Sequence, residues 1–126
     1  GRTPAPTLGD TPIAHRPMSL IDHEQLDDLR AMLGARLATM VSTLAEQATS
    51  GITDMRAALA AGELAALTHV AHRLKGGAGA LGAAALTDAA ARLETLARAG
   101  DPAPLADAID AVETLIEPTL AALRGA

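Results

Sequence analysis

From residue 22 to the C-terminus, apolar side chains recur at intervals of three and four, a spacing that places them along one face of a helix. Five segments carry this pattern, one short and four long, at residues 22–33, 35–60, 63–81, 84–99 and 102–126. The predicted apolar face of the short segment consists of Leu26, Leu29, Met32 and Leu33. The breaks between them hold Gly34, Gly62, Gly82 and Gly100, and glycine is frequent just beyond a helix end. Ser19 or Asp22 is the expected N-cap of the first helix, and Asp101, followed by Pro102, that of the last.

This pattern predicts an all-α protein. Short connections make successive helices antiparallel neighbours, so the four long segments predict an up-down-up-down four-helix bundle, with the short N-terminal helix capping one end. The chain has no Phe, Tyr or Trp, so aliphatic residues and alanine must form the core, where small side chains let helices approach closely. Pro118 is expected to kink the last helix.

The first 19 residues lack a repeating apolar pattern and hold four prolines, at Pro4, Pro6, Pro12 and Pro17. They are interpreted as a linker or tail, which leaves residues 20–126 as one domain. Because the chain begins with Gly1 rather than Met, we expect it to be a piece of a longer protein.

Charge and composition exclude several classes of function. A net charge of −5 without a cluster of Lys or Arg argues against nucleic acid as a partner. No apolar run approaches the roughly 18 residues that a membrane span needs, so no direct membrane contact is expected. The absence of cysteine excludes disulfides and thiolate zinc sites and is compatible with a cytoplasmic protein.

The third segment carries polar chemistry on the side opposite its apolar face. His72 lies there, with Gly76 four residues later, Gly79 seven residues later, and His69 and Lys75 three residues to either side. Glycine inside a helix costs about 0.8 to 1 kcal/mol relative to alanine, and close approach by a partner is one reason to accept that cost. The alternative is that the glycines end the helix near residue 76 and that His72 is an ordinary solvated residue.

The run from Ala71 to Ala83, AHRLKGGAGALGA, resembles the signature of histidine-containing phosphotransfer (Hpt) domains. In that family His-x-Leu-Lys-Gly is followed by small residues and Leu-Gly-Ala. The resemblance extends to a Leu-x6-Leu-Glu-x3-Arg pattern and to the Gly-Asp that commonly opens the histidine-bearing helix. These patterns are matched by Leu86, Leu93, Glu94 and Arg98, and by Gly62-Glu63.

The resemblance implies the same helical bundle and a phosphoacceptor role for His72. Imidazole suits that role because it is substantially neutral near pH 7 and is a good nucleophile. Lys75 would offset the roughly two negative charges that a phosphoryl group adds. The implied partners are receiver domains of response regulators, whose aspartates exchange the phosphoryl group and whose own sites supply Mg²⁺. Gly76, Gly79, His69 and Arg73 are the expected docking residues.

The domain is expected to be a monomeric phosphocarrier rather than an enzyme. It lacks a Walker-type phosphate loop, and we expect it to bind no cofactor or metal of its own. Its predicted context is the C-terminal part of a hybrid sensor histidine kinase, which could make it the cytosolic end of a membrane-bound protein. Two alternatives remain. One is a chemotaxis-kinase-type domain phosphorylated by an ATP-bound kinase domain, and the other is a helical bundle that uses its exposed face only as a docking or inhibitory surface.

Two alternatives also concern the histidines. Helical periodicity alone cannot choose between His69 and His72 as the phosphoacceptor, but only His72 is followed by Lys and Gly at the family's spacing. The two histidines could also form a metal pair, although the sequence offers no evident third ligand on that strip.

Overall fold

A computed structural model describes residues 19–125 of the chain, so the predicted linker lies outside the described residues except for Ser19. The described part consists of five helices and their connections, without strands, as an all-α protein requires. The helices are α2 (His23–Leu33), α3 (Arg36–Ala61), α4 (Leu64–Ala80), α5 (Ala84–Arg98) and α6 (Leu105–Gly125).

Most helix ends lie where the sequence predicts them. Asp22 is the N-cap of α2, and its side chain accepts a hydrogen bond from the Gln25 backbone N–H at 3.1 Å. Gly34 and Gly62 end α2 and α3 with φ angles of 54° and 73°, a backbone conformation that glycine adopts without steric cost.

The start of the last helix was predicted wrongly. α6 begins at Leu105 rather than at Pro102, because residues 101–104 first form a separate turn. In that turn the Asp101 carboxylate accepts the Ala103 N–H at 3.0 Å. Ala103 also precedes Pro104, and a residue before proline is disfavoured in the helical region. Pro118 lies inside α6, which continues past it; the kink stays a prediction.

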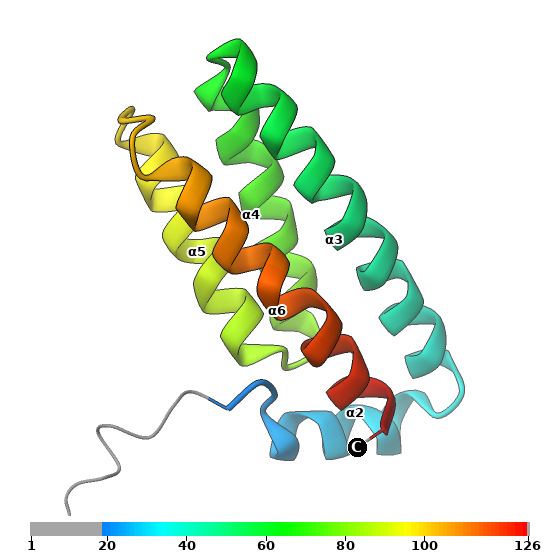
Figure 1. Ribbon diagram of the computed structural model, residues 1–126. Coiled ribbons are helices and arrows are strands. Elements are labelled where there is room, and N and C mark those ends of the chain that lie inside the picture. Colours follow the sequence, from blue (N-terminus) through cyan, green and yellow to red (C-terminus); the bar gives the residue numbers. More distant parts are fainter. Residues whose placement is uncertain (1–18, 126) are drawn as a thin grey trace, which may run out of the picture.

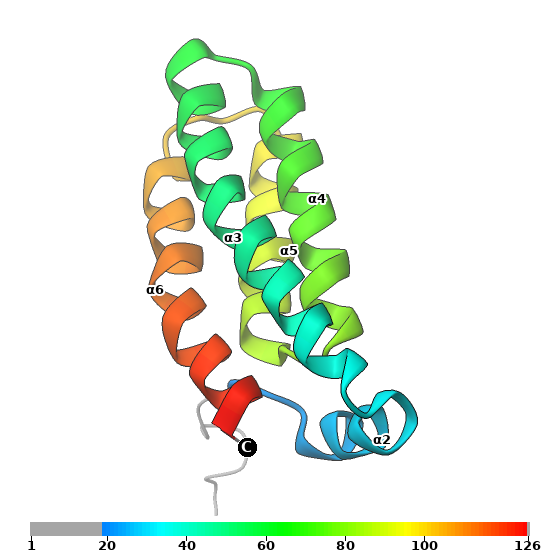
Figure 2. The same cartoon turned by 90° about the vertical axis from the view of Figure 1, so that its right-hand side faces the viewer.

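The four long helices lie side by side, and α2 lies across one end of them (Figures 1 and 2). α4 packs against α3 and α5, and α6 packs against the same two helices on the other side of the bundle. The core between them is aliphatic, as the absence of aromatic residues demands. Its fully buried large side chains include Met55, Leu67, Leu74, Leu86, Leu93, Ile109 and Val112, and its buried alanines include Ala48, Ala71, Ala78 and Ala90.

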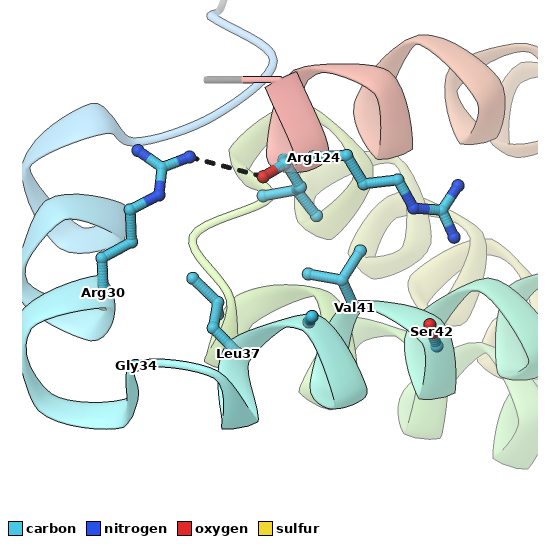
Figure 3. Close-up of a pocket in the computed structure, with 8 residues that line it drawn as sticks. Arg30, Gly34, Leu37, Val41, Ser42 and Arg124 are labelled. Carbon is cyan, nitrogen blue, oxygen red and sulfur yellow. Dashed lines mark hydrogen bonds between the residues drawn. The ribbon is translucent and has the colours of Figure 1, made fainter.

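α2 closes the end of the bundle. Leu26 is fully buried, whereas Met32, which the apolar pattern also assigned to the inner face, is 72% exposed. The Asp22 N–H donates to the Gly82 carbonyl at 2.7 Å and thus ties the start of α2 to the α4–α5 turn. Arg30 reaches the end of α6, with its guanidinium 3.5 Å from the Leu123 carbonyl oxygen, beside a cavity of about 460 Å³ (Figure 3). Within residues 19–125, the helices are too short or too polar to span a bilayer.

Candidate functional site

The polar strip of α4 stays helical throughout, since α4 continues to Ala80. The glycines therefore do not end the helix at residue 76. His72 lies on the outer face with 60% of its side chain exposed. One turn later, a β-carbon added at Gly76 would meet no atom within 4 Å. The surface beyond His72 toward the C-terminus of α4 is therefore open.

The three glycines of α4 have different surroundings. A β-carbon on Gly77 would collide with the Gln47 side-chain oxygen and lie 3.6 Å from Leu44, so Gly77 permits close contact with α3. Gly79 is half-buried beside Thr87 of α5, and its carbonyl accepts a hydrogen bond from Gln25 at 2.9 Å. Gly76 is thus the one of the three whose missing side chain leaves open space.

A buried carboxylate from α5 organises the polar side chains around His72. Glu94 is only 3% exposed, and its two oxygens contact three donors. Oε2 lies 2.9 Å from His72 Nδ1 and 2.7 Å from the Arg98 guanidinium. Oε1 lies 2.8 Å from Lys75 Nζ. One α5 residue therefore brings together the histidine and lysine of α4 and the arginine one turn along α5.

These donors keep Glu94 ionised. The hydrogen bond from Lys75 is the largest influence, and together with those from His72 and Arg98 it lowers the Glu94 pKa to about 2, from an ordinary value of 4.5. Burial acts in the opposite direction, because it disfavours the charged form. Glu94 therefore carries a full negative charge at neutral pH.

An ionised Glu94 assigns the tautomer of His72. A carboxylate only accepts hydrogen bonds, so a neutral imidazole in this contact must carry its proton on Nδ1. The lone pair is then on Nε2, the nitrogen that Glu94 does not contact. A neutral nitrogen lone pair on an exposed side chain is a nucleophile.

The other predicted residues lie around this centre. His69 is exposed one turn before His72 and is not among the donors to Glu94. Arg73 is exposed and lines a groove of about 360 Å³ between α4 and α3. Lys75, predicted as a charge beside His72, is bound to Glu94. In the described part of the chain, no group of three or more His, Asp or Glu side chains is arranged to hold a metal ion.

Glu94 was not selected as a site residue from the sequence, although it belongs to the Leu-Glu-x3-Arg pattern. The signal was a charged residue at an inward-facing position of α5, among Ala90, Leu93 and Ala97, which are all buried. A buried carboxylate requires hydrogen-bonding partners, and Arg98 at four residues is one of them.

Comparisons with known proteins agree with this arrangement. The Hpt domain family matches residues 39–124 of the chain. The chain is also similar to the crystal structure of histidine-containing phosphotransfer protein B (HptB) from Pseudomonas aeruginosa PAO1, with a TM-score of 0.80 and 25% sequence identity. That similarity covers 86% of this chain and 95% of the HptB chain. The curated proteins contain no match.

Proposed function

The chain belongs to the Hpt domain family, whose members serve histidine phosphotransfer in phosphorelays, and from that premise we propose that His72 is its phosphoacceptor. The observation that carries the proposal is the contact between Glu94 and His72 Nδ1, because it leaves Nε2 as the free nucleophile of an exposed imidazole. The proposed partners are receiver domains, with which Hpt proteins interact.

In the proposed reaction, the Nε2 lone pair attacks the phosphorus of a receiver's aspartyl phosphate. The bond between phosphorus and the aspartyl oxygen breaks, and the receiver aspartate leaves as a carboxylate with that electron pair. His72 keeps its proton on Nδ1, so its ring becomes cationic as the N–P bond forms. The Glu94 carboxylate, 2.9 Å from Nδ1, stabilises that positive charge. Reversal of the same steps returns the phosphoryl group to a receiver.

Lys75 is the proposed counter-charge for the transferred group. It is one turn from His72, so it can reach a phosphoryl group that carries about two negative charges. The open surface at Gly76 supports docking of a receiver there. Gly79, His69 and Arg73 complete the proposed docking residues, and Mg²⁺ is expected from the receiver's own site.

Membership of the Hpt family also bears on the topology of the bundle and on the protein to which the domain belongs. We infer an up-down-up-down antiparallel bundle, supported by the short connections and by the course of the ribbon in Figure 1. The domain is proposed to act as a monomeric phosphocarrier without an ATP site, cofactor or metal of its own. Its proposed setting is the cytoplasmic, C-terminal part of a hybrid sensor histidine kinase.

A comparison of two histidine variants tests the assignment. The purified protein is incubated with a panel of receiver domains phosphorylated by acetyl phosphate, and acid-labile phosphate on the protein is measured. His72→Gln keeps a polar side chain but lacks a nucleophilic nitrogen, so uptake is expected to fall to background. The far-ultraviolet circular dichroism spectrum is expected to stay unchanged, because the side chain is exposed.

His69→Gln is the matched control, since it makes the same change one turn away on α4. His69 is a proposed docking residue and not the nucleophile, so this variant is expected to keep clear uptake, lowered at most by weaker docking. Loss of uptake in His69→Gln together with retention in His72→Gln would contradict the assignment. Phosphorylation by an ATP-bound kinase domain, with no uptake from any receiver, would favour the chemotaxis-kinase-type alternative.

A further inference from the structure

Two permanent cations share one carboxylate in the Glu94 cluster, which we define as Glu94, His72, Lys75 and Arg98. Lys75 Nζ lies 2.8 Å from Glu94 Oε1, and the Arg98 guanidinium lies 2.7 Å from Oε2. A single cation would balance the charge of Glu94. With His72 in its neutral form, the cluster therefore carries one positive charge beyond what Glu94 requires.

The two cations differ in where they come from. Arg98 and Glu94 are four residues apart on α5, so their contact is made within one helix. Lys75 reaches Glu94 from α4, the helix that carries His72. Lys75 can thus turn away from Glu94 toward His72 while the contact between Glu94 and Arg98 stays in place.

We propose that Arg98 is a positioning residue, which holds the charge of Glu94 so that Lys75 can move from Glu94 to the phosphoryl group on His72. This inference rests on the proposed phosphoacceptor role of His72. Before phosphorylation, both cations bind Glu94. After it, Arg98 and the Nδ1–H of the phosphorylated His72 ring balance Glu94, and the ammonium of Lys75 pairs with the phosphoryl oxygens.

The burial of Glu94 is what makes Arg98 necessary. Removing a counter-ion from a buried carboxylate is strongly destabilising, so without Arg98 the lysine, as the only permanent cation beside Glu94, would be held there. A guanidinium has five N–H donors in a planar fork and can serve both oxygens of a carboxylate. Arg98 can therefore take over the oxygen that Lys75 leaves. Its 66% exposed side chain leaves it room to adjust.

A double-mutant cycle on the full chain tests this inference. Phosphoramidate, a small phosphoryl donor, is used to phosphorylate the protein without any receiver, and the half-life of the phosphohistidine at residue 72, identified by mass spectrometry, is measured in four proteins. These are the unmodified chain, Lys75→Met, Arg98→Met and the double variant. In the unmodified background, Lys75→Met is expected to shorten the half-life by a factor of roughly 1.4 to 5, the range for one exposed ion pair.

In the Arg98→Met background, the same lysine substitution is expected to have little effect, because Lys75 would already be retained by Glu94. Arg98→Lys keeps a cation on Glu94 and is expected to restore much of the lysine effect. Arg92→Met is the matched control, because Arg92 is exposed two residues before Glu94 and therefore lies on the opposite side of α5. It is expected to leave the lysine effect intact.

Equal shortening by Lys75→Met with and without Arg98 would overturn the inference. A purely structural role for Arg98 would lower the unfolding temperature but leave the lysine effect unchanged, which is the same contrary result. Failure of receivers to phosphorylate a protein that phosphoramidate does label would count against the proposed partners alone. Absence of phosphohistidine after phosphoramidate treatment would overturn both proposals.

Discussion

Glu94 keeps its negative charge inside the bundle because Lys75, His72 and Arg98 donate hydrogen bonds to it. The stability of the protein should therefore depend on pH in the acidic range. The pKa of Glu94 is about 2 in the folded protein, below the ordinary value of 4.5 expected after unfolding. Because the pKa of Glu94 is lower in the folded than in the unfolded protein, its ionisation stabilises the fold in full at pH values above the unfolded pKa. That contribution is lost as pH falls from about 4.5 toward 2.

Glu94→Gln is expected to remove this contribution. The free energy of unfolding, measured with urea by far-ultraviolet circular dichroism because the chain has no aromatic residue, should be lower for the variant at pH 6. The difference from the unmodified protein should narrow as the pH falls through this window. Glu117→Gln, on the exposed side of α6, is the control and should show no comparable narrowing. A difference in the free energy of unfolding between Glu94→Gln and the unmodified protein that stays constant from pH 6 to pH 2 would contradict the assigned charge of Glu94.

Sequence reasoning reached His72 and Lys75 but not the contacts between them. Periodicity assigns each residue to a face of its own helix, so it could place His72 and Lys75 on the polar side of α4. It does not fix how α4 and α5 align along their lengths, and that alignment brings Glu94 to His72. The Leu-Glu-x3-Arg pattern contains the relevant carboxylate, but its partner on α4 is defined only by the packed bundle.

At the scale of one element, the glycines of α4 have different surroundings and therefore different roles. Gly77 gives α3 room, whereas Gly76 faces open space. From the sequence, the cost of Gly76 and Gly79 was ascribed to approach by a partner, and for both glycines this stays a prediction. No separate assignment was made for Gly77, which faces Gln47 and Leu44 of α3.

Gly76→Leu is expected to separate stability from transfer. Leucine is the better helix former by roughly 0.6 to 0.8 kcal/mol, and its side chain would enter open space, so the unfolding temperature should rise or stay unchanged. The same side chain one turn from His72 should hinder a docking receiver and reduce phosphotransfer. Thermal unfolding and transfer from a phosphorylated receiver measure the two effects.

Gly77→Leu is the matched control for Gly76→Leu. It adds the same side chain toward α3, where the end of Gln47 must move aside and Leu44 lies 3.6 Å from the new β-carbon, so its unfolding temperature should lie below that of Gly76→Leu. If Gly76→Leu unfolds at a lower temperature and still accepts phosphate, the glycine is needed for the backbone or packing, and the argument from access fails.

At the scale of the whole molecule, apolar periodicity and glycine breaks were enough to predict five helices and an aliphatic core. The ends of α3, α4 and α5 lie within one residue of the predicted ends, because glycines in short turns mark them in the sequence. The start of α6 was missed, because Asp101 accepts the Ala103 N–H in the turn before the helix rather than capping the helix itself, and the effect of Pro104 on Ala103 was not weighed. The predicted apolar face of α2 was also too broad, because α2 packs only against the end of the bundle, which buries Leu26 but not Met32.

The extent to which α2 belongs to the cooperative fold can be measured through Leu26. Its side chain is fully buried, and the adjoining Asp22 and Gln25 bind the end of α4 and the α4–α5 turn through backbone carbonyls. Leu26→Ala should therefore leave a cavity within the main core and lower the free energy of unfolding by about 2–5 kcal/mol. Met32→Ala, at a residue 72% exposed on the same helix, should change it by no more than about 0.5 kcal/mol.

Urea unfolding followed by far-ultraviolet circular dichroism should give a single transition for both variants if α2 unfolds together with the bundle. Equal, small effects of the two substitutions would instead show that α2 detaches without disturbing the core. The fully buried Leu26 side chain argues for the cooperative outcome, because release of α2 would expose it to water and would also break the hydrogen bond from Gln25 to the Gly79 carbonyl.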